Sequence, residues 1–353
     1  MIPALLGGAA VAALISAGVC RVQMIKGPLD AADEDHKTHP RATPTSGGIG
    51  IAVGYAIALT LLARVPAFAL LDRQASALVS LLSIFAFVFL LIGFIDDTRR
   101  LGPRFKLLLF TMLAIGSAIT MGIVDTLPLG GGQMIKLGLS IGLFGTALWV
   151  FTLVNCVNFM DGANGLSLGS MVFGLLALGA IGVADGSTAA AGLGFCTAGA
   201  IAGFLFWNFP RGAIFAGDAG ALFTGSVAAL TSLILIARFD LSPFIPPLLF
   251  LPLLADALLT LAWRVWRRQP LLVGHQEHAY QIAIRAGLPA TQVTLIYWAL
   301  MAVLGVLGFH LSRQQGSSAP WIVFSLISLA FLAGYVAVRR FAKARGYDQA
   351  AAA

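Results

Sequence analysis

Charged residues are scarce in this chain. Asp, Glu, Lys and Arg make up only 10% of its 353 residues, whereas 59% are hydrophobic and the mean hydropathy is +0.91. Because a soluble domain carries roughly a quarter charged residues, the composition excludes a soluble globular protein and leaves little room for a soluble domain. We expect membrane lipids among its partners and no nucleic acid.

Cysteine is also rare. The three cysteines, Cys20, Cys156 and Cys196, lie in or beside apolar runs, which excludes a disulfide framework and a cysteine-based metal site. The sequence contains no internal repeat and no linker of domain size. We therefore interpret residues 1–353 as a single domain.

Apolar runs long enough to cross a bilayer are abundant. A transmembrane helix needs about 20 apolar residues, and eleven stretches come close to or exceed this length. They lie at about residues 3–20, 47–64, 77–95, 106–124, 137–155, 165–184, 188–206, 219–237, 243–262, 291–310 and 320–338. The sequence therefore predicts an all-α, polytopic integral membrane protein with about 11 transmembrane helices.

The basic residues predict the orientation. An odd number of spans puts the termini on opposite sides, and 17 of the 22 Lys and Arg residues then fall on the side of the C-terminus. By the positive-inside rule that side is cytoplasmic and the N-terminus is periplasmic, as in a bacterial inner membrane. The connections on the other side are expected to be plain turns. The cytoplasmic connections are residues 21–46, 96–106, 156–164, 207–219 and 263–290.

One of these connections is unusually polar. Asn155, Asn158 and Asp161 are spaced by three, which stacks side chains on one face of a helical end, and Gly162 and Gly165 follow. Glycine allows a sharp turn or a close approach to a ligand. A polar connector with a helix cap is the structural alternative.

Carboxylates mark two further connections. Asp96 and Asp97 are adjacent, and they repel each other unless a metal ion or nearby cations such as Lys106 neutralise them. Asp218 stands between glycines at the start of a run, where it suits a helix N-cap or a metal ligand. Asp256 differs, because it lies inside the ninth apolar run, and an ionisable residue there is a functional candidate.

The remaining connections are basic. Lys37 and Arg41 lie beside Thr and Ser hydroxyls, a combination that suits phosphate but also an ordinary solvated loop. His275 and His278 are three residues apart, and we prefer them as phosphate hydrogen-bond donors or structural partners over metal ligands. The tail after the last run is basic and then alanine-rich.

All five polar clusters fall on the same predicted side of the membrane. The carboxylates form an all-oxygen set suited to Mg²⁺, with Mn²⁺ as a substitute, and the basic loops suit anionic substrates. Together they favour a membrane enzyme that joins a soluble phosphorylated substrate to a lipid. A transporter of anionic substrates would instead place charges near mid-membrane and show inverted repeats, and a structural scaffold leaves the clusters unexplained.

The motifs resemble the polyprenyl-phosphate N-acetylhexosamine-1-phosphate transferases of glycosyltransferase family 4, relatives of the phospho-N-acetylmuramoyl-pentapeptide transferase. They occur in the family's order over about residues 37–281. They are Pro44 with Gly47-Gly48, Phe94-Ile95-Asp96-Asp97 with Lys106, Asn155-x-x-Asn158-x-x-Asp161-Gly162-x-x-Gly165, Ile214-Phe215-x-Gly217-Asp218-x-Gly220, and His275 with His278.

The resemblance implies a reaction and roles. It implies Mg²⁺-dependent transfer of an N-acetylaminosugar 1-phosphate from a UDP-sugar to undecaprenyl phosphate, with release of UMP; a homodimer is compatible with the sequence. The catalytic set would be Asp96, Asp97, Asp161, Asp218 and His278. The metal ligands would come from Asp218, Asp97, Asn158 and Asp161, and the substrate-binding residues would be Lys106, Asn155, Asn158, His275, Lys37 and Arg41.

The His278-Ala279-Tyr280-Gln281 ending looks most like the O-antigen-initiating subgroup, which uses UDP-N-acetylated 6-deoxyhexoses. The peptidoglycan enzyme, the alternative within the family, is expected to carry a triple-His segment that is missing here. Asn164 and Gln276 also depart from the family's usual residues. A base role of Asp96 or Asp97 is left open, because a phosphate monoester is largely dianionic at pH 7 without help.

Overall fold

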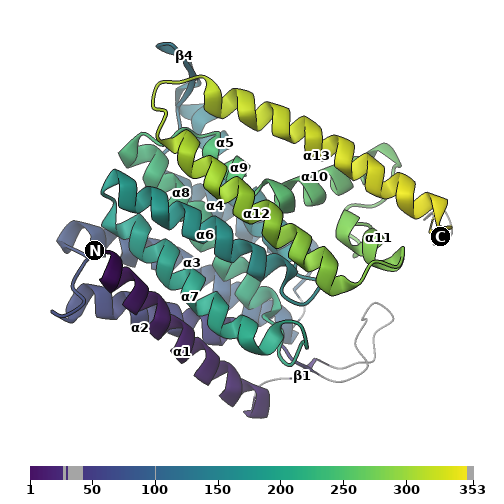
Figure 1. Cartoon of the computed structure of the whole chain (residues 1–353), viewed down its shortest axis with the longest axis horizontal. Coiled ribbons are helices and arrows are strands. Elements are labelled where there is room, and N and C mark those ends of the chain that lie inside the picture. Colours follow the sequence, from purple (N-terminus) through teal and green to yellow (C-terminus); the bar gives the residue numbers. More distant parts are fainter. Residues whose placement is uncertain (27–28, 31–42, 100, 348–353) are drawn as a thin grey trace.

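The computed structural model describes residues 1–26, 29–30, 43–99 and 101–347, and helices dominate this part of the chain (Figure 1). The helices are α1 (Ile2–Lys26), α2 (Gly47–Arg64), α3 (Arg73–Arg99), α4 (Pro103–Met121), α5 (Gly138–Phe159), α6 (Leu166–Asp185), α7 (Thr188–Asn208), α8 (Gly217–Phe239), α9 (Ile245–Leu249), α10 (Leu251–Trp266), α11 (Ala279–Arg285), α12 (Ala290–Ser312) and α13 (Ala319–Ala344). Two antiparallel strand pairs join β1 (Leu29–Asp30) to β2 (Thr43–Pro44) and β3 (Thr126–Gly130) to β4 (Gln133–Lys136).

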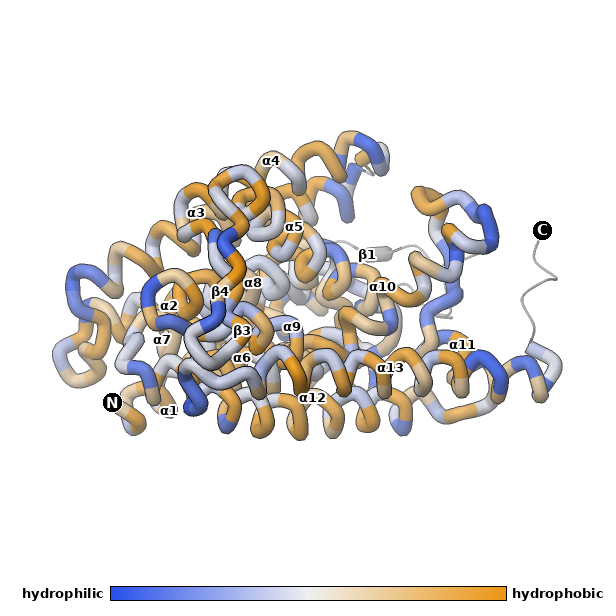
Figure 2. The backbone as a smooth tube through the Cα atoms, turned by 90° about the horizontal axis from the view of Figure 1, so that it is seen from above, coloured by the Kyte–Doolittle hydropathy of each residue, from blue (hydrophilic) through white to orange (hydrophobic). Residues whose placement is uncertain are grey.

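The prediction of a polytopic membrane protein is confirmed. Within the described residues ten helices are long and apolar enough to cross a bilayer, namely α1 to α8, α12 and α13. Figure 2 shows apolar residues along these helices and hydrophilic stretches mostly at their ends. In Figure 1 the N-terminus and the end of α13 lie at opposite ends of the bundle.

The sequence predicts about eleven spans, and ten continuous helices of spanning length are found among the described residues, because the ninth predicted span is divided into α9 and α10. The chain breaks at Phe250, whose backbone (φ −104°, ψ 11°) separates α9 from α10. Pro252 has no N–H to continue the hydrogen-bond ladder back to Leu248, and a proline fits best in the first turn of a new helix. After the break, α10 packs against α13.

Helix α8 forms the centre of the bundle. In its apolar window 94% of the residues are buried inside the protein, compared with 6% in α13, which lies at the periphery. Close packing elsewhere depends on small residues: a Cβ on Gly199 or Gly203 of α7 would lie 2.2 Å and 2.1 Å from the carbonyl oxygens of Ala9 and Ala13 on α1. Small residues at this spacing let two helix backbones approach within a membrane.

The connection between α4 and α5 differs from the plain turn that the sequence predicts. It forms the β3–β4 hairpin around Gly130, Gly131 and Gly132, all of which have positive φ. The Trp321 indole of α13 donates a hydrogen bond to the Leu129 carbonyl at 2.7 Å, and Gly131 N donates to Gly316 O at 3.0 Å. The hairpin therefore ties the middle of the chain to the start of α13 at the end of the bundle away from the polar motifs.

Candidate functional site

The polar motifs of the sequence meet at one end of the bundle. The backbone entering α2 pairs with the backbone preceding α8: Gly47 N donates to Phe215 O at 2.9 Å, and Gly48 N donates to Ala216 O at 3.0 Å. Phe215 N donates in turn to Pro44 O at 2.8 Å. These bonds join the first and fourth predicted cytoplasmic connections into one structure.

The end of α3 caps the start of α8. The Asp97 carboxylate accepts the backbone N–H of Asp218 at 2.9 Å and that of Ala219 at 3.2 Å. An anion at a helix N-terminus is stabilised by the unpaired N–H groups and the helix dipole. Gly217 is required in this place, because its φ is +69° and a Cβ would lie 2.4 Å from an Asp97 oxygen.

Lys106 lies between two carboxylates from different helices. From the first turn of α4 its ammonium pairs with Asp96 of α3 and with Asp218 of α8, the latter at 2.5 Å. The second Asp96 oxygen accepts the Leu101 N–H at 2.7 Å. The ion-pair interpretation of the two adjacent aspartates is therefore confirmed for Asp96, while Asp97 acts as a helix cap.

The Asn-rich motif divides into inward-facing and site-facing residues. Asn155 is buried, and its amide donates to the Phe151 carbonyl of its own helix at 2.7 Å. Asn158, one turn later in α5, interacts with the Asp218 carboxylate. Since α5 ends at Phe159, Asp161 lies in the following loop and not on the same helical face as the two asparagines.

Asp161 faces the same group of charges. Desolvation makes the largest contribution, and the negative charges of Asp218 and Asp97 add to it. Together they raise the pKa of the Asp161 carboxyl well above its usual range. A cation at this place would favour the ionised form of Asp161 and stabilise the three carboxylates together.

Asn208 holds the loop after Asp161 in position, a role that the sequence analysis missed. Its carbonyl oxygen accepts Gly165 N at 2.7 Å, and its amide donates to Ile214 O at 2.8 Å. Asn164 adds a bond to Pro210 O at 3.0 Å. An asparagine that closes an otherwise apolar run was the available signal, because buried amides need partners on both sides.

The histidine segment is built around Asp256. This carboxylate, 4% exposed, accepts the backbone N–H groups of Ala279 at 2.7 Å and Tyr280 at 3.1 Å. It also accepts the Tyr297 hydroxyl at 2.6 Å and lies 3.5 Å from Nδ1 of His278. Asp256 thus holds α11 and His278 together, which explains an ionisable residue inside an apolar run.

The two histidines have different surroundings. Their ring centroids are 5.0 Å apart, but His278 is only 3% exposed, whereas His275 is partly exposed. Desolvation is the main cause, and the proximity of His278, Arg264 and Arg339 adds to it; together they lower the pKa of His275 to about 4. His275 is therefore neutral near pH 7 and able to donate one hydrogen bond.

The histidine segment adjoins the Asn-rich loop through Tyr280. A Cβ on Gly162 would lie 2.2 Å from the Tyr280 hydroxyl oxygen, so only glycine lets these two segments touch. The predicted residues at this end of the bundle are Asp96, Asp97, Lys106, Asn158, Asp161, Asp218, His275 and His278. Their catalytic and binding roles stay predictions. Lys37 and Arg41 lie outside the described residues.

Long apolar helices with charged side chains grouped at one end of the bundle define a polytopic membrane protein with a candidate site at that end. The family model for glycosyl transferase family 4 matches residues 78–236. A phospho-N-acetylmuramoyl-pentapeptide-transferase of Bacillus cytotoxicus (strain DSM 22905 / CIP 110041 / 391-98 / NVH 391-98) is 30% identical over 298 residues, which cover 79% of this chain and 87% of that protein.

Two further relatives cover similar shares. A protein of Bacillus subtilis (strain 168) with the name "Probable undecaprenyl-phosphate N-acetylglucosaminyl 1-phosphate transferase" is 24% identical, over 89% of this chain and 86% of its own length. A phospho-N-acetylmuramoyl-pentapeptide-transferase of Moorella thermoacetica (strain ATCC 39073 / JCM 9320) is 28% identical, over 76% and 84%. The chain belongs to glycosyl transferase family 4 and is a phosphosugar transferase of the multi-pass membrane type.

Proposed function

We propose that this chain transfers an N-acetylaminosugar 1-phosphate from a UDP-sugar to undecaprenyl phosphate and releases UMP. An oxygen of the lipid phosphate attacks the sugar-linked phosphorus, a P–O–P bond to the lipid forms, and the bond to UMP breaks. The name of the Bacillus subtilis relative supports undecaprenyl phosphate as the acceptor. The observation that carries the proposal is the Lys106 ammonium between Asp96 and Asp218 at the start of α8.

The arrangement suits phosphoryl transfer, in which positioning and charge stabilisation provide most of the catalysis. Lys106 supplies a fixed positive charge, and the Asp96 carboxylate keeps it in place. A phosphate monoester has a second pKa of about 6, so the lipid nucleophile is mostly dianionic at pH 7. We therefore assign Asp96 and Asp97 to positioning Lys106 and α8, with no proton transfer required of them.

We propose Mg²⁺ as the cofactor, with Mn²⁺ as a substitute. The donors at the site are hard oxygens, as Mg²⁺ prefers, and Asp218 with Asp161 and Asn158 would hold the ion. When bound, it would neutralise charge on the diphosphate as a Lewis acid. Among the described residues no three His, Cys, Asp or Glu side chains group at metal-binding spacing, which fits an ion held by one or two carboxylates and substrate phosphates.

The proposed role of Asp97 differs from the ligand role that the resemblance implies. Both of its carboxylate oxygens already accept backbone N–H groups at the start of α8. We propose that Asp97 positions Asp218 and does not bind the metal ion. Likewise, the inward hydrogen bond of Asn155 favours a structural role over substrate binding.

We further propose that the protein lies in the bacterial inner membrane with this site facing the cytoplasm, where UDP-sugars are made. The placement of 17 of 22 basic residues supports this orientation. The product would start an O-antigen or another cell-envelope polysaccharide. Two of the relatives are named for the peptidoglycan reaction, but the single His278-Ala279-Tyr280 ending favours a smaller UDP-aminosugar.

The test is UMP release by the purified full-length protein with undecaprenyl phosphate, Mg²⁺ and a panel of UDP-sugars. The panel includes UDP-N-acetylglucosamine, UDP-N-acetylated 6-deoxyhexoses and UDP-N-acetylmuramoyl-pentapeptide. We expect turnover that needs both the lipid and Mg²⁺, and we expect the rate of UMP release to differ among the three donor classes. Release of UMP only with the pentapeptide donor would contradict the proposed sugar class, and no release with any donor would contradict the reaction.

A matched pair of variants tests the metal assignment. Asp218→Asn removes a charge from the proposed ligand, and we expect it to abolish Mg²⁺-dependent turnover in a folded protein. Asp240→Asn removes an exposed charge at the other end of α8 and should leave turnover unchanged. Near-normal activity of Asp218→Asn would show that Asp218 is not a ligand of the metal ion.

A further inference from the structure

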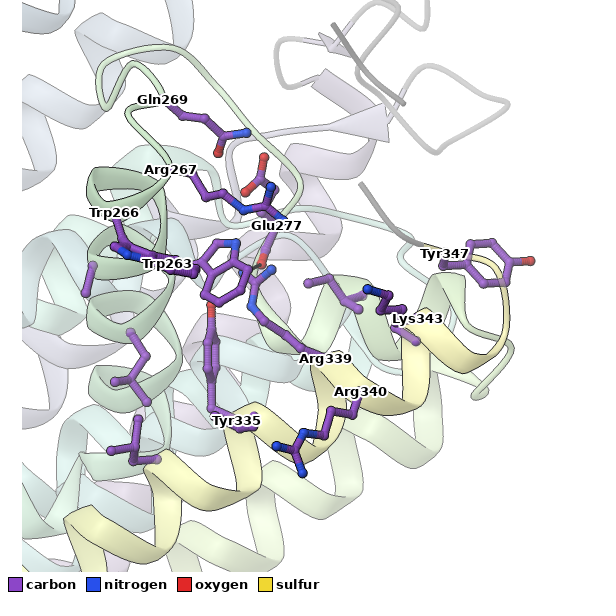
Figure 3. A pocket seen from close by; sticks show the side chains of 16 residues that line it. Trp263, Trp266, Arg267, Gln269, Glu277, Tyr335, Arg339, Arg340, Lys343 and Tyr347 are labelled. Carbon is purple, nitrogen blue, oxygen red and sulfur yellow. Dashed lines mark hydrogen bonds between the residues drawn. The ribbon is translucent and has the colours of Figure 1, made fainter. Parts of the chain in front are cut away.

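A cavity of about 580 Å³ lies outside the candidate site, between α10, α11 and the last turns of α13 (Figure 3). Part of its lining is apolar and includes Leu259, Ala262, Leu332 and Val336. Leu332 and Val336 are 44% and 39% exposed, on the helix that is least buried of the ten spans. The apolar side of this cavity therefore opens toward the part of the surface that faces lipid.

The other wall of the cavity is cationic and aromatic. Arg267, Arg339, Arg340 and Lys343 line it, together with Trp263, Trp266, Tyr335 and Tyr347. Figure 3 shows the Trp263 ring between the side chains of Arg267 and Arg339. Their guanidinium carbons lie 5.2 Å and 4.6 Å from the ring centroid, which fixes both cations at the wall of the cavity.

The three arginines in this wall form no ion pair with the described part of the chain. The carboxylate in its lining, Glu277, forms an ion pair with Arg264 at 2.8 Å, and Arg264 does not line the cavity. Arg339 donates to the Glu277 carbonyl at 3.1 Å, but its buried Nε has no hydrogen-bond partner among the described residues. Arg267 and Arg340 form no hydrogen bond or ion pair through their side chains with the described part of the chain. The wall thus presents the donors and positive charge of Arg267 and Arg340 without an acceptor from the described residues.

The position of the cavity indicates what supplies the acceptor. It lies at the end of α13 that adjoins α11, the same membrane end as the candidate site. Trp and Tyr are typical of the headgroup level of a bilayer, and Arg and Lys there attract anionic lipids. Cations above an apolar wall match a phosphate headgroup that is attached to acyl chains.

We propose that this cavity binds the headgroup of an anionic membrane phospholipid. The phosphate would accept hydrogen bonds from Arg267 and Arg340, and the glycerol and upper acyl chains would lie against Leu332 and Val336. Because Arg339 contacts the Glu277 carbonyl next to His278, an occupied site would also support the histidine segment. The proposal goes beyond the transferase reaction and does not depend on it.

The test measures lipid binding directly, without nucleotide sugar. Full-length, delipidated protein in detergent is titrated with dioleoyl phosphatidylglycerol, and bound lipid is counted by native mass spectrometry. Dioleoyl phosphatidylcholine and sn-glycerol 1-phosphate serve as separate arms. We expect phosphatidylglycerol to bind well above both, because only this ligand combines a net negative phosphate with acyl chains.

The variants separate this cavity from general surface charge. Arg267→Gln with Arg340→Gln should weaken phosphatidylglycerol binding on the order of 30-fold, since each basic side chain near an anionic headgroup contributes about 1 kcal/mol. Arg99→Gln with Arg104→Gln removes two exposed cations from the same membrane end and should leave binding unchanged. Arg340→Glu, a single change at an exposed position, repeats the test with less risk to folding.

Three outcomes would overturn the proposal. Undiminished binding by folded Arg267→Gln/Arg340→Gln and Arg340→Glu proteins would remove the cavity as the site. If phosphatidylcholine binds as well as phosphatidylglycerol, the site does not require an anionic headgroup. If sn-glycerol 1-phosphate binds as well as phosphatidylglycerol, the site binds a soluble phosphate and not a lipid. Loss of UMP release in these variants plays no part in the decision.

Discussion

The Asp97 carboxylate on α3 accepts the backbone N–H of Asp218 on α8 at 2.9 Å, although the two residues are 121 positions apart. Two acidic residues that would repel through their side chains are therefore joined through a backbone donor. The side chain of Asp218 is left to pair with Lys106. This contact sets the position of the carboxylate on which the proposed chemistry depends.

Removal of the cap should lower both stability and turnover. Asp97→Ala deletes both acceptors at the start of α8, and we expect a loss of about 1–2 kcal/mol in the free energy of unfolding, as for other helix caps. Turnover should fall about 100-fold, because a displacement of about 1 Å at a reacting centre has an effect of this size. Asp97→Asn keeps one acceptor oxygen and should retain more of both. Thermal unfolding in detergent and UMP release measure the two effects, and equal activity loss in both variants at unchanged stability would favour a direct metal-ligand role.

The Lys106 ammonium should be needed for turnover. Lys106→Met leaves the Asp96 and Asp218 carboxylates without their shared cation. We expect UMP release to fall by about 10²–10³-fold, as when one preorganised donor is removed from a charge-stabilising site. The Mg²⁺ concentration for half-maximal rate should also decrease, because the ammonium no longer competes for Asp218.

Lys106→Arg is the control for this prediction, since it keeps the positive charge but changes its geometry. Its activity should lie between those of the wild type and Lys106→Met. Full activity of Lys106→Met would contradict the proposed role. An increase in the required Mg²⁺ concentration would contradict competition between the ammonium and the metal ion.

Periodicity and motif order made much of the fold predictable. Ten apolar runs become long helices because a bilayer span requires uninterrupted internal hydrogen bonds. The ninth run failed as a single span because hydropathy does not register a missing N–H, and Pro252 breaks the ladder inside a stretch that is mostly apolar. The β3–β4 hairpin was missed because its stability depends on Trp321 and Gly316, nearly two hundred residues away.

The site was only partly predictable for a similar reason. Residue types and spacing singled out Asp97, Asp161 and Asp218, but not which of them uses its oxygens on backbone donors. Asn155 and Asn158 look equivalent in the sequence, yet one bonds to its own helix and the other interacts with Asp218. Such divisions depend on how neighbouring helices pack, which sequence spacing does not specify.

Asp256 should support the protein through its partners on α11. Asp256→Ala leaves two buried backbone N–H groups and the Tyr297 hydroxyl without an acceptor. Each unsatisfied donor costs about 1–3 kcal/mol, so we expect a decrease of about 3 kcal/mol or more in the free energy of unfolding. Asp256→Asn keeps one acceptor oxygen and should lose less. Chemical unfolding in mixed micelles measures the difference.

A positioning role for Asp256 also predicts a kinetic change. Because Asp256 lies 3.5 Å from His278, Asp256→Asn should lower turnover in protein that is still folded, about tenfold if His278 contributes one transition-state contact. Asp240→Asn, an exposed change at the opposite end, should alter neither property. Unchanged turnover in a folded Asp256→Asn protein would limit Asp256 to a structural role.

The neutral state of His275 predicts a pH-dependent stability. Desolvation, and to a smaller extent the proximity of His278, Arg264 and Arg339, lower its pKa from the ordinary 6.5 to about 4 in the folded protein. Between these values the unfolded chain binds this proton more readily than the folded protein does. The stability that comes from neutral His275 is therefore complete above pH 6.5 and is lost as the pH falls toward 4.

Replacing His275 by Asn should remove this dependence, because asparagine does not titrate. The wild-type melting temperature is expected to decrease between pH 6.5 and 4, the interval between the two pKa values, and the His275→Asn variant should decrease less over the same interval. His310→Asn, which changes an exposed histidine near the far end of α12, should follow the wild-type curve. Parallel curves for all three proteins would mean that the pKa of His275 in the folded protein is close to its ordinary value of 6.5. In that case His275 would carry a charge in mildly acidic solution and would be suited to pair with a phosphate, which is the opposite of the neutral donor that its surroundings favour.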